Sequence, residues 1–149
     1  MPHFTREVDA LGAILNIVLA VSDARAHALE VAGLPIPGLI NAKGMVDTGA
    51  SCTCIDPSII ATLRIPPSGE AYMRTPSTGS EPVNVNEYDV SLSIFGPSTD
   101  HPPYCIPNLA VVESQLLQAH GFHALIGRDV LSNCVFSYNG ALRLYTLAF

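Results

Sequence analysis

One short run of the chain carries the side chains best suited to chemistry. Met45 and Val46 are apolar, and Asp47, Thr48 and Gly49 follow them directly with a carboxylate, a hydroxyl and a glycine. A carboxylate held at the end of an apolar strand can act as a general base toward water or, when protonated, as a general acid. The run therefore predicts an acid–base site centred on Asp47.

A bare Asp-Thr-Gly also has an ordinary explanation, because a turn aspartate commonly accepts hydrogen bonds from the backbone that follows it. A second pattern favours the functional interpretation. Residues 124–126 are apolar, and Gly127, Arg128 and Asp129 come directly after them. The chain thus contains two short apolar strands that each run into a glycine-containing turn, in an arrangement that suits a shared site.

Together these motifs resemble the retropepsins, the single-domain aspartic proteases of retroviruses and of their cellular and bacterial relatives. In that family the Asp-Thr-Gly-Ala turn carries the catalytic aspartate, and the apolar-apolar-Gly-Arg-Asp stretch packs behind it. The resemblance runs from about Ile14 to the C-terminus, and residues 85–89 are similar to the strand that leaves the family's flap hairpin. It implies catalytic roles for Asp47, Thr48 and Gly49, and structural support of the site from Ile126, Gly127, Arg128 and Asp129.

The resemblance also implies a set of substrate contacts. Ala50 and Ser51 would line the backbone of a bound peptide at the end of the catalytic turn. The flap tip would lie at Thr78, Gly79 and Ser80, and it would close over a substrate bound as an added strand. No cofactor and no metal are expected. The expected partners are a second copy of the chain and a peptide or protein substrate.

Aspartic proteolysis needs two carboxylates that share one proton, because two like charges in near contact cannot both ionise. The chain has a single Asp-Thr-Gly and no Asp-Ser-Gly. Asp56, Asp89, Asp100 and Asp129 do not lie in such a turn. The second carboxylate must then come from a second copy of Asp47 across a two-fold axis. We therefore predict a C2 homodimeric aspartic endopeptidase that cleaves extended peptides at apolar positions.

Two features depart from the viral pattern. Viral members commonly carry an acidic residue where Ser51 stands, paired with the arginine that corresponds to Arg128, and serine cannot make that ion pair. Arg128 is expected to be structural, in an internal ion pair or in a clamp on carbonyl oxygens. The flap also lacks the several glycines of viral flaps, and Pro76 is expected to stiffen one of its arms.

Two alternatives stay open at this stage. The first is a catalytically silent module of the same fold that binds peptides or dimerises, because a fold does not fix an activity. The second is a metal site, which the spacing disfavours because it matches no tetrahedral zinc pattern. The side chains concerned are Cys52, Cys54, His101, Cys105, His120 and His123. The cysteines are expected to be reduced, and oxidation of Cys52 near a dimer cleft could impair the site.

Composition sets limits on the class of protein. The chain has 149 residues, 13% charged and 48% hydrophobic, and a formal net charge of −6. These values indicate one domain over residues 1–149 and exclude a disordered chain, and the acidic balance argues against nucleic-acid binding. A charged fraction below the typical value of about 25% indicates apolar surface covered by a partner. Residues 1–10 could form a flexible N-terminal segment.

The apolar run at residues 11–21 lacks the positive flank of a signal peptide and is too short to span a bilayer. Arg6 is offset by Glu7 and Asp9, and Asn16 interrupts the run. We expect no membrane association from these features, and a cytoplasmic location in view of the unpaired cysteines.

The hydrophobic pattern predicts a mostly β domain with one or two short helices, which in the retropepsin-like acid protease fold is a closed, barrel-like domain. Strands are expected at residues 13–21, 40–46, 83–94, 106–112, 124–126, 135–138 and 142–146. Short helices are expected after Ser22, after Asp56 and at residues 129–134, and a hairpin joins Met73 to Val83. Asn139-Gly140 predicts a two-residue hairpin turn.

Overall fold

Apolar residues along the first long strand bury one of its faces fully and the other in part. A computed structural model of the protein describes residues 1–74, 79, 81–98 and 100–149. In it, β2 (Ile14–Val21) turns Leu15, Ile17 and Leu19 into the main core, and the alternate residue Ile14 packs into a second apolar cluster. The strand is confirmed, but its burial on both sides is only partial, because on the second face Asn16 is exposed and Val18 is half-buried.

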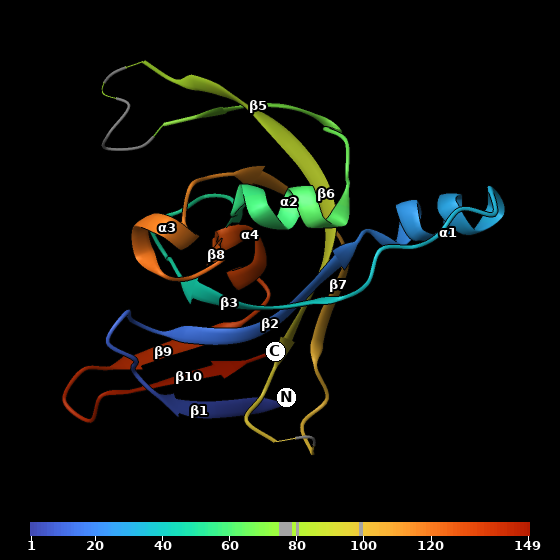
Figure 1. Cartoon of the computed structure of the whole chain (residues 1–149). Coiled ribbons are helices and arrows are strands. Elements are labelled where there is room, and N and C mark those ends of the chain that lie inside the picture. Colours follow the sequence, from blue (N-terminus) through green and yellow to red (C-terminus); the bar gives the residue numbers. More distant parts are fainter. Residues whose placement is uncertain (75–78, 80, 99) are drawn as a thin grey trace.

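Six strands close into a ring (Figure 1). The hydrogen-bonded order is β2, β3 (Ile40–Val46), β8 (Ala124–Ile126), β4 (Cys54–Ile55), β7 (Tyr104–Glu113) and β6 (Val83–Phe95), and an antiparallel pairing of β6 with β2 completes the circuit. β5 (Gly69–Met73) adds to the free side of β6 and forms with it the hairpin at the top of Figure 1. The barrel encloses the main core.

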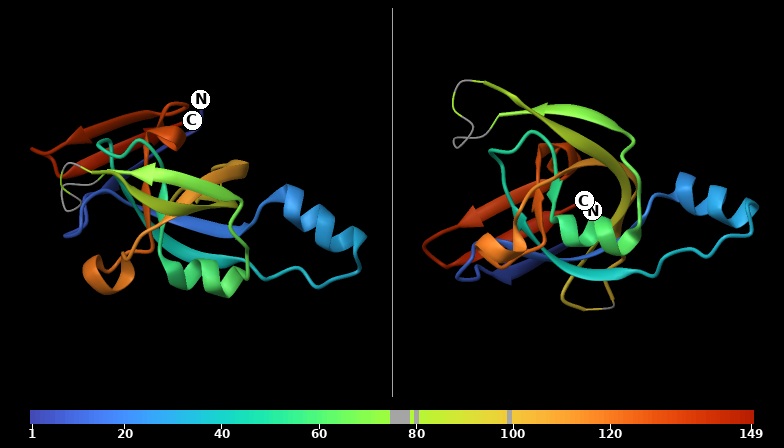
Figure 2. Two further views of the ribbon diagram at one scale, coloured as in Figure 1. Left: turned by 90° about the horizontal axis from the view of Figure 1, so that it is seen from above. Right: turned by 45° about the horizontal axis from the view of Figure 1, so that its top comes forward.

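A separate three-stranded sheet gathers the two ends of the chain. It has the order β1 (His3–Glu7), β10 (Leu144–Ala148) and β9 (Val135–Asn139), all antiparallel. Figure 2 shows the two termini side by side at this sheet. The expectation of a flexible segment over residues 1–10 is wrong for β1, because five of its residues pair with β10 and Phe4 is only 3% exposed.

The C-terminal hairpin forms as expected, but its turn is longer. Asn139 pairs with Leu144, so four residues rather than two connect the strands. The side-chain oxygen of Asn139 accepts a hydrogen bond from the N–H of Leu142 at 3.0 Å. The left-handed conformation is adopted by Arg143, with φ 53°, and not by the glycine at position 140. The two-residue prediction fails because Asn139 stays in the strand and caps the loop with its side chain.

Four helices complete the fold. α1 (Asp23–Val31) and α2 (Pro57–Leu63) begin at Ser22 and Asp56, whose side chains accept backbone N–H bonds. α3 (Leu117–His120) and α4 (Arg128–Leu131) are single turns. The two longer helices match the expected one or two short helices. In the part of the chain that the structure describes, no helix combines the length and apolarity needed to cross a membrane.

Asp56 joins two of these helices through a buried carboxylate that is 5% exposed. One oxygen accepts hydrogen bonds from the N–H and the hydroxyl of Ser58, at 3.0 and 2.6 Å, and the other accepts from the N–H groups of Leu116 and Leu117, at 2.9 and 2.8 Å. Burial alone would raise the pKa of Asp56, but these hydrogen bonds outweigh it and lower the pKa from 3.8 to about 2.

Replacing Asp56 by alanine should destabilise the protein by about 3 kcal/mol, because two buried N–H groups at the start of α3 and the cap of α2 lose their acceptor. The folded-state pKa lies below the unfolded value, so the stabilisation is present above pH 3.8 and disappears as the pH falls toward about 2. Urea unfolding over this range measures the effect. The exposed carboxylate of Asp89 provides the control, and an equal loss in Asp89→Ala would contradict the assignment.

Candidate functional site

Parallel pairing of β3 with β8 places the Asp47 turn. Met45 lies opposite Leu125 and Val46 opposite Ile126, and the N–H of Asp47 extends this ladder to the carbonyl of Ile126 at 3.0 Å. The close approach of β3 to β8 depends on Gly44, since a Cβ there would lie 2.9 Å from the side chain of Ile126. The turn therefore begins at the shared ends of two parallel strands.

The turn itself fixes one oxygen of the Asp47 carboxylate. Oδ1 accepts hydrogen bonds from the N–H of Gly49 at 2.9 Å and of Ala50 at 3.3 Å. No described residue hydrogen-bonds to the second oxygen, and the side chain is half-buried. Thr48 and Gly49 are exposed. The arrangement holds the carboxylate in one orientation and leaves one oxygen free.

Arg128 clamps the same turn from behind. Its Nη1 donates to the carbonyls of Thr48 at 2.9 Å and Gly49 at 3.0 Å, and its backbone N–H donates to the carbonyl of Ala50 at 3.0 Å. Of the two roles expected for Arg128, the contacts match the carbonyl clamp. Ser51 is exposed, and the acidic partner of viral members is not needed for this clamp.

A buried hydrogen-bond network packs behind the turn. Thr53 donates from its hydroxyl and its N–H to the two oxygens of Asp129, both at 2.8 Å, and its hydroxyl accepts from the N–H of Gly127 at 3.1 Å. A Cβ on Gly127 would lie 2.6 Å from the carbonyl of Cys52, so only glycine fits there. The sequence interpretation missed Thr53, because a buried threonine has no distinct pattern until its partner is known.

Two clefts meet at Asp47. One, of about 420 Å³, is lined by Asp47, Ala50, Ser51, Cys52, Met73 and Arg74 among others. The other, of about 460 Å³, is lined by Leu11, Met45, Asp47, Ala119, His120, Phe122 and Leu125. Among the described residues that line the two clefts, Asp47 alone is acidic. A carboxylate thus stands between two mainly apolar surfaces.

The predicted contact residues are brought together only in part. Ala50 and Ser51 line the first cleft. Thr78 and Ser80, like Pro76, lie outside the described residues, and Gly79 is exposed with φ +69°.

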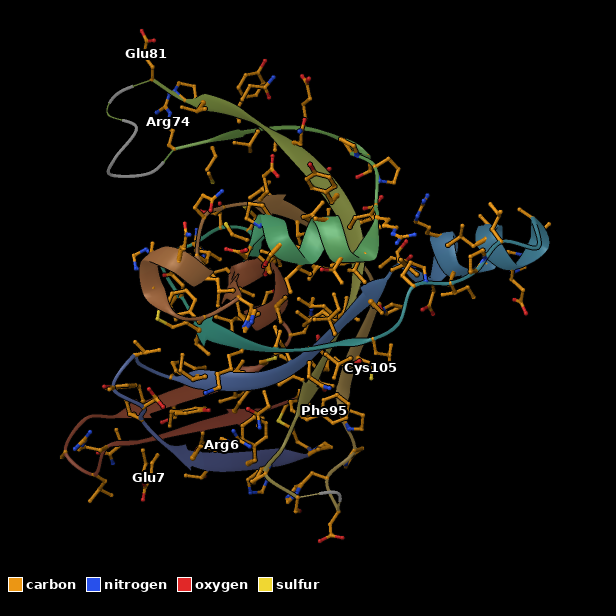
Figure 3. The ribbon with its side chains drawn as sticks, in the orientation of Figure 1. Arg6, Glu7, Arg74, Glu81, Phe95 and Cys105 are labelled. Atoms are coloured by element: carbon orange, nitrogen blue, oxygen red, sulfur yellow. The ribbon has the colours of Figure 1, made fainter. Side chains whose placement is uncertain are left out.

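Met73 and Arg74 were missed by the sequence interpretation. They reach the first cleft from the end of β5, and Figure 3 shows Arg74 opposite Glu81 where the described part of the hairpin ends. Their position just before the hairpin turn is the signal that could have selected them.

The cysteines do not form a reactive centre of their own. All four thiols are unpaired. Burial, and then the neighbouring Cys52, raises the pKa of Cys54 to about 12, which keeps that thiol protonated and unreactive. Cys52 is half-buried and lines the first cleft. Within the described part of the chain, no group of three His, Cys, Asp or Glu side chains could hold a metal ion.

Comparisons with known proteins agree with this geometry. The model of a family described as aspartyl protease matches residues 28–130. No curated protein sequence matches the chain. A retropepsin-like aspartic protease from Rickettsia conorii has a similar structure, with a TM-score of 0.57 and 15% sequence identity over 99% of this chain and 90% of that one. That likeness is one of fold, and it confirms the expected mostly β, closed barrel.

A second solved structure is more distant. The retroviral protease-like domain of Ddi1 from Leishmania major gives a TM-score of 0.37 and 13% identity over 86% of this chain and 82% of that one. The fold similarity therefore rests on the Rickettsia protein.

Replacing Thr53 by valine should destabilise the protein by about 2 kcal/mol, because the N–H of Gly127 and the carboxylate of Asp129 each lose a buried hydrogen-bond partner while the side-chain volume is kept. Urea unfolding measures this loss. Thr53→Ser retains the hydroxyl and should recover most of it. Equal destabilisation by Thr53→Ser, which lacks only the methyl group, and by Thr53→Val, which lacks only the hydroxyl, would contradict this prediction. The hydrogen bonds of the hydroxyl would then contribute nothing to stability beyond packing.

Proposed function

This chain belongs to the aspartyl protease family, and we propose that it is an aspartic endopeptidase that acts as a C2 homodimer with Asp47 of each copy at the axis. The observation that supports the proposal is the way in which the two oxygens of the Asp47 carboxylate are held and exposed. Gly49 and Ala50 hold one oxygen by backbone hydrogen bonds, and the other oxygen is open at the junction of two clefts.

The second catalytic group has to come from another copy. Asp47 is the single aspartate in an Asp-Thr-Gly turn and the single acidic group described along both clefts. Asp47 of the partner subunit, related by a two-fold axis, would bring the two open oxygens together, and the pair would then hold one proton between them. The exposed Thr48 is proposed to hydrogen-bond across this axis and keep the two turns rigid.

With one proton on the pair, hydrolysis needs no other group. The ionised carboxylate removes a proton from a water molecule, whose oxygen attacks the peptide carbonyl carbon while the protonated carboxylate donates its proton to the carbonyl oxygen. The resulting diol breaks its C–N bond as the amine nitrogen takes up the proton held by the pair, and one diol hydroxyl becomes the carbonyl of the acid and returns its proton to an ionised carboxylate of the pair. The products are a carboxylic acid and an amine, and the pair again holds one proton.

The proposed substrate is an extended peptide with apolar side chains beside the cleaved bond. Met45, Phe122 and Leu125 line one cleft, and Met73 extends over the other from the β5–β6 hairpin. We propose that this hairpin is the flap, with Ala50 and Ser51 below it contacting the substrate backbone. Closure over a bound peptide would exclude water from the two carboxylates.

Replacing Asp47 by asparagine should lower the cleavage rate of a mixed peptide library by at least about a hundredfold, because the neutral amide cannot take the proton from water. Mass spectrometry of the library products measures cleavage, and sedimentation measures the dimer, which should persist. Asp89→Asn is the matched control and should retain activity. Undiminished cleavage by Asp47→Asn would refute the catalytic assignment.

Replacing Arg128 by lysine should lower kcat about tenfold with a smaller change in KM. The lysine side chain is shorter, and its ammonium cannot hold both carbonyls of the turn, so the Asp47 carboxylate loses its alignment. Steady-state kinetics on one cleaved peptide measures both constants. The exposed Arg143→Lys is the control. A change confined to KM would place Arg128 in substrate binding instead of in positioning the turn.

The silent binding module predicts a different outcome for the wild-type protein. It would give a dimer that binds extended peptides and releases no product at any pH from acid to neutral. A protein that stays monomeric across micromolar concentrations would contradict both the protease and the dimerising module, because each needs the two-fold contact.

A further inference from the structure

A protruding arm is the part of the molecule that the proposed catalysis does not use. α1 leaves the barrel at the end of β2, and residues 32–39 return to the start of β3 at Ile40. We call residues 23–39 the arm. Figures 1 and 2 show it projecting from the side of the barrel opposite the β5–β6 hairpin tip. Asp47 follows the other end of β3, so the arm is remote from the candidate catalytic site.

The arm is held at its base and along its return. Ser22 caps α1, the side-chain oxygen of Asn108 accepts from the N–H of Ala24 at 3.2 Å, and the N–H of Leu34 donates to the carbonyl of Leu29 at 2.9 Å. Yet no side chain of α1 is buried. An isolated helix of this length is marginal in water, and most helices gain stability from packing one face. The arm therefore has a fixed shape and only a partly covered face, on which Ala26 packs against the main core and Arg25 and Leu29 are half-buried.

Large apolar side chains gather on the arm in the open. Val31, Leu34, Ile36 and Leu39 are between 49% and 75% exposed. Single exposed apolar residues are ordinary, but a contiguous group on one projection is typical of a surface that contacts another molecule. Pro35 and Pro37 flank Ile36, so this stretch is stiff and donates few N–H groups, and a partner would be held by its side chains and not as an added strand.

A groove of about 550 Å³ lies between the arm and the end of α2. Its apolar surface is formed by Leu29, Leu34, Ile36 and Leu39. Positive charge comes from Arg25 and Arg64. None of the described residues that line it is acidic. The acidic residues of α1, at positions 23 and 30, do not line it. The two arginines are a notable share of the seven Lys and Arg in a chain of net charge −6.

Arg25, which lines the groove, also has an unsatisfied donor inside the protein. Its Nε is enclosed by the protein and has no hydrogen-bond acceptor among the described residues. An enclosed donor without an acceptor is uncommon in native structures and calls for an explanation. The enclosed Nε is not open to the groove, so a carboxylate there would pair with the terminal guanidinium nitrogens of Arg25 by charge-assisted hydrogen bonds.

We propose that this groove is a docking site for a peptide segment of another protein that combines apolar side chains with carboxylates. The apolar side chains contact Leu34, Ile36 and Leu39, and the carboxylates pair with Arg25 and Arg64. A second copy of this chain fits less well, because a two-fold contact of arm on arm would bring the like-charged arginines of the two copies together. The site acts apart from Asp47 and does not depend on the proposed catalysis.

Selection of short random peptides displayed on phage tests the docking site, with the full-length Asp47→Asn variant as the target so that bound peptides stay intact. The enriched peptides should combine Asp or Glu with Leu, Ile or Phe. Fluorescence anisotropy of the best peptide should show about tenfold weaker binding to Arg25→Glu and to Arg64→Glu, and weaker binding at higher salt.

Matched variants separate the groove from general effects of charge or hydrophobicity. Arg143→Glu makes the same charge change as Arg64→Glu at a residue that is also in the left-handed conformation, with φ 53° against 51°, and binding should be unchanged. Leu34→Ser should weaken binding, whereas Val31→Ser, at a residue that is more exposed (75% against 56%) but outside the groove lining, should not. Circular dichroism verifies that each variant is folded.

Several results would overturn the proposal. These are the absence of any enriched peptide, enrichment of peptides without acidic residues, or binding that Arg25→Glu and Arg64→Glu leave intact. Self-association of the protein that Leu34→Ser abolishes would instead assign the groove to a second copy. Loss of cleavage activity has no bearing on these readouts, so failure of the protease assignment and failure of the docking site remain distinguishable.

Discussion

The parallel contact of β3 with β8 is the constraint on which the site depends. It brings the turn after Val46 against the turn after Ile126, so that each stabilises the other: Arg128 binds the carbonyls of the first turn, and Thr53 ties Asp129 and Gly127 to the segment that leaves it. The contact is close because Gly44 and Gly127 have no side chain. The orientation of the Asp47 carboxylate is thus a property of two strands and not of one loop.

Three charged side chains near the candidate site act through hydrogen bonds to the backbone. Asp56, Asp129 and Arg128 each bind backbone groups of neighbouring segments instead of forming ion pairs. A carboxylate that accepts several N–H bonds is well stabilised even where it is buried, as Asp56 is. The carbonyl clamp of Arg128 likewise needs no acidic side chain at Ser51.

The local motifs allowed much of the fold to be predicted. Alternating apolar residues predicted β2, β6 and β8, and the Asp47 and Gly127 motifs predicted a retropepsin-like barrel. Long-range pairing escaped the same reasoning. β1 has no strong pattern of its own and is fixed by β10, the role of Thr53 depends on Asp129, and Met73 and Arg74 reach the cleft only because β5 folds over it. Such features depend on which distant segments pair in the fold, and local residue patterns in a single sequence do not show that pairing.

The sheet that gathers the chain ends has a consequence for biosynthesis. β1 leaves the ribosome before β2, but its partner β10 spans Leu144–Ala148. The nascent chain can therefore form the β2–β3 pairing early, whereas β1 must wait until residues 144–148 have been synthesised. Contacts between such distant residues form slowly, since a long loop has to close first. The late closing step delays complete folding of this sheet until residues 144–148 have left the ribosome.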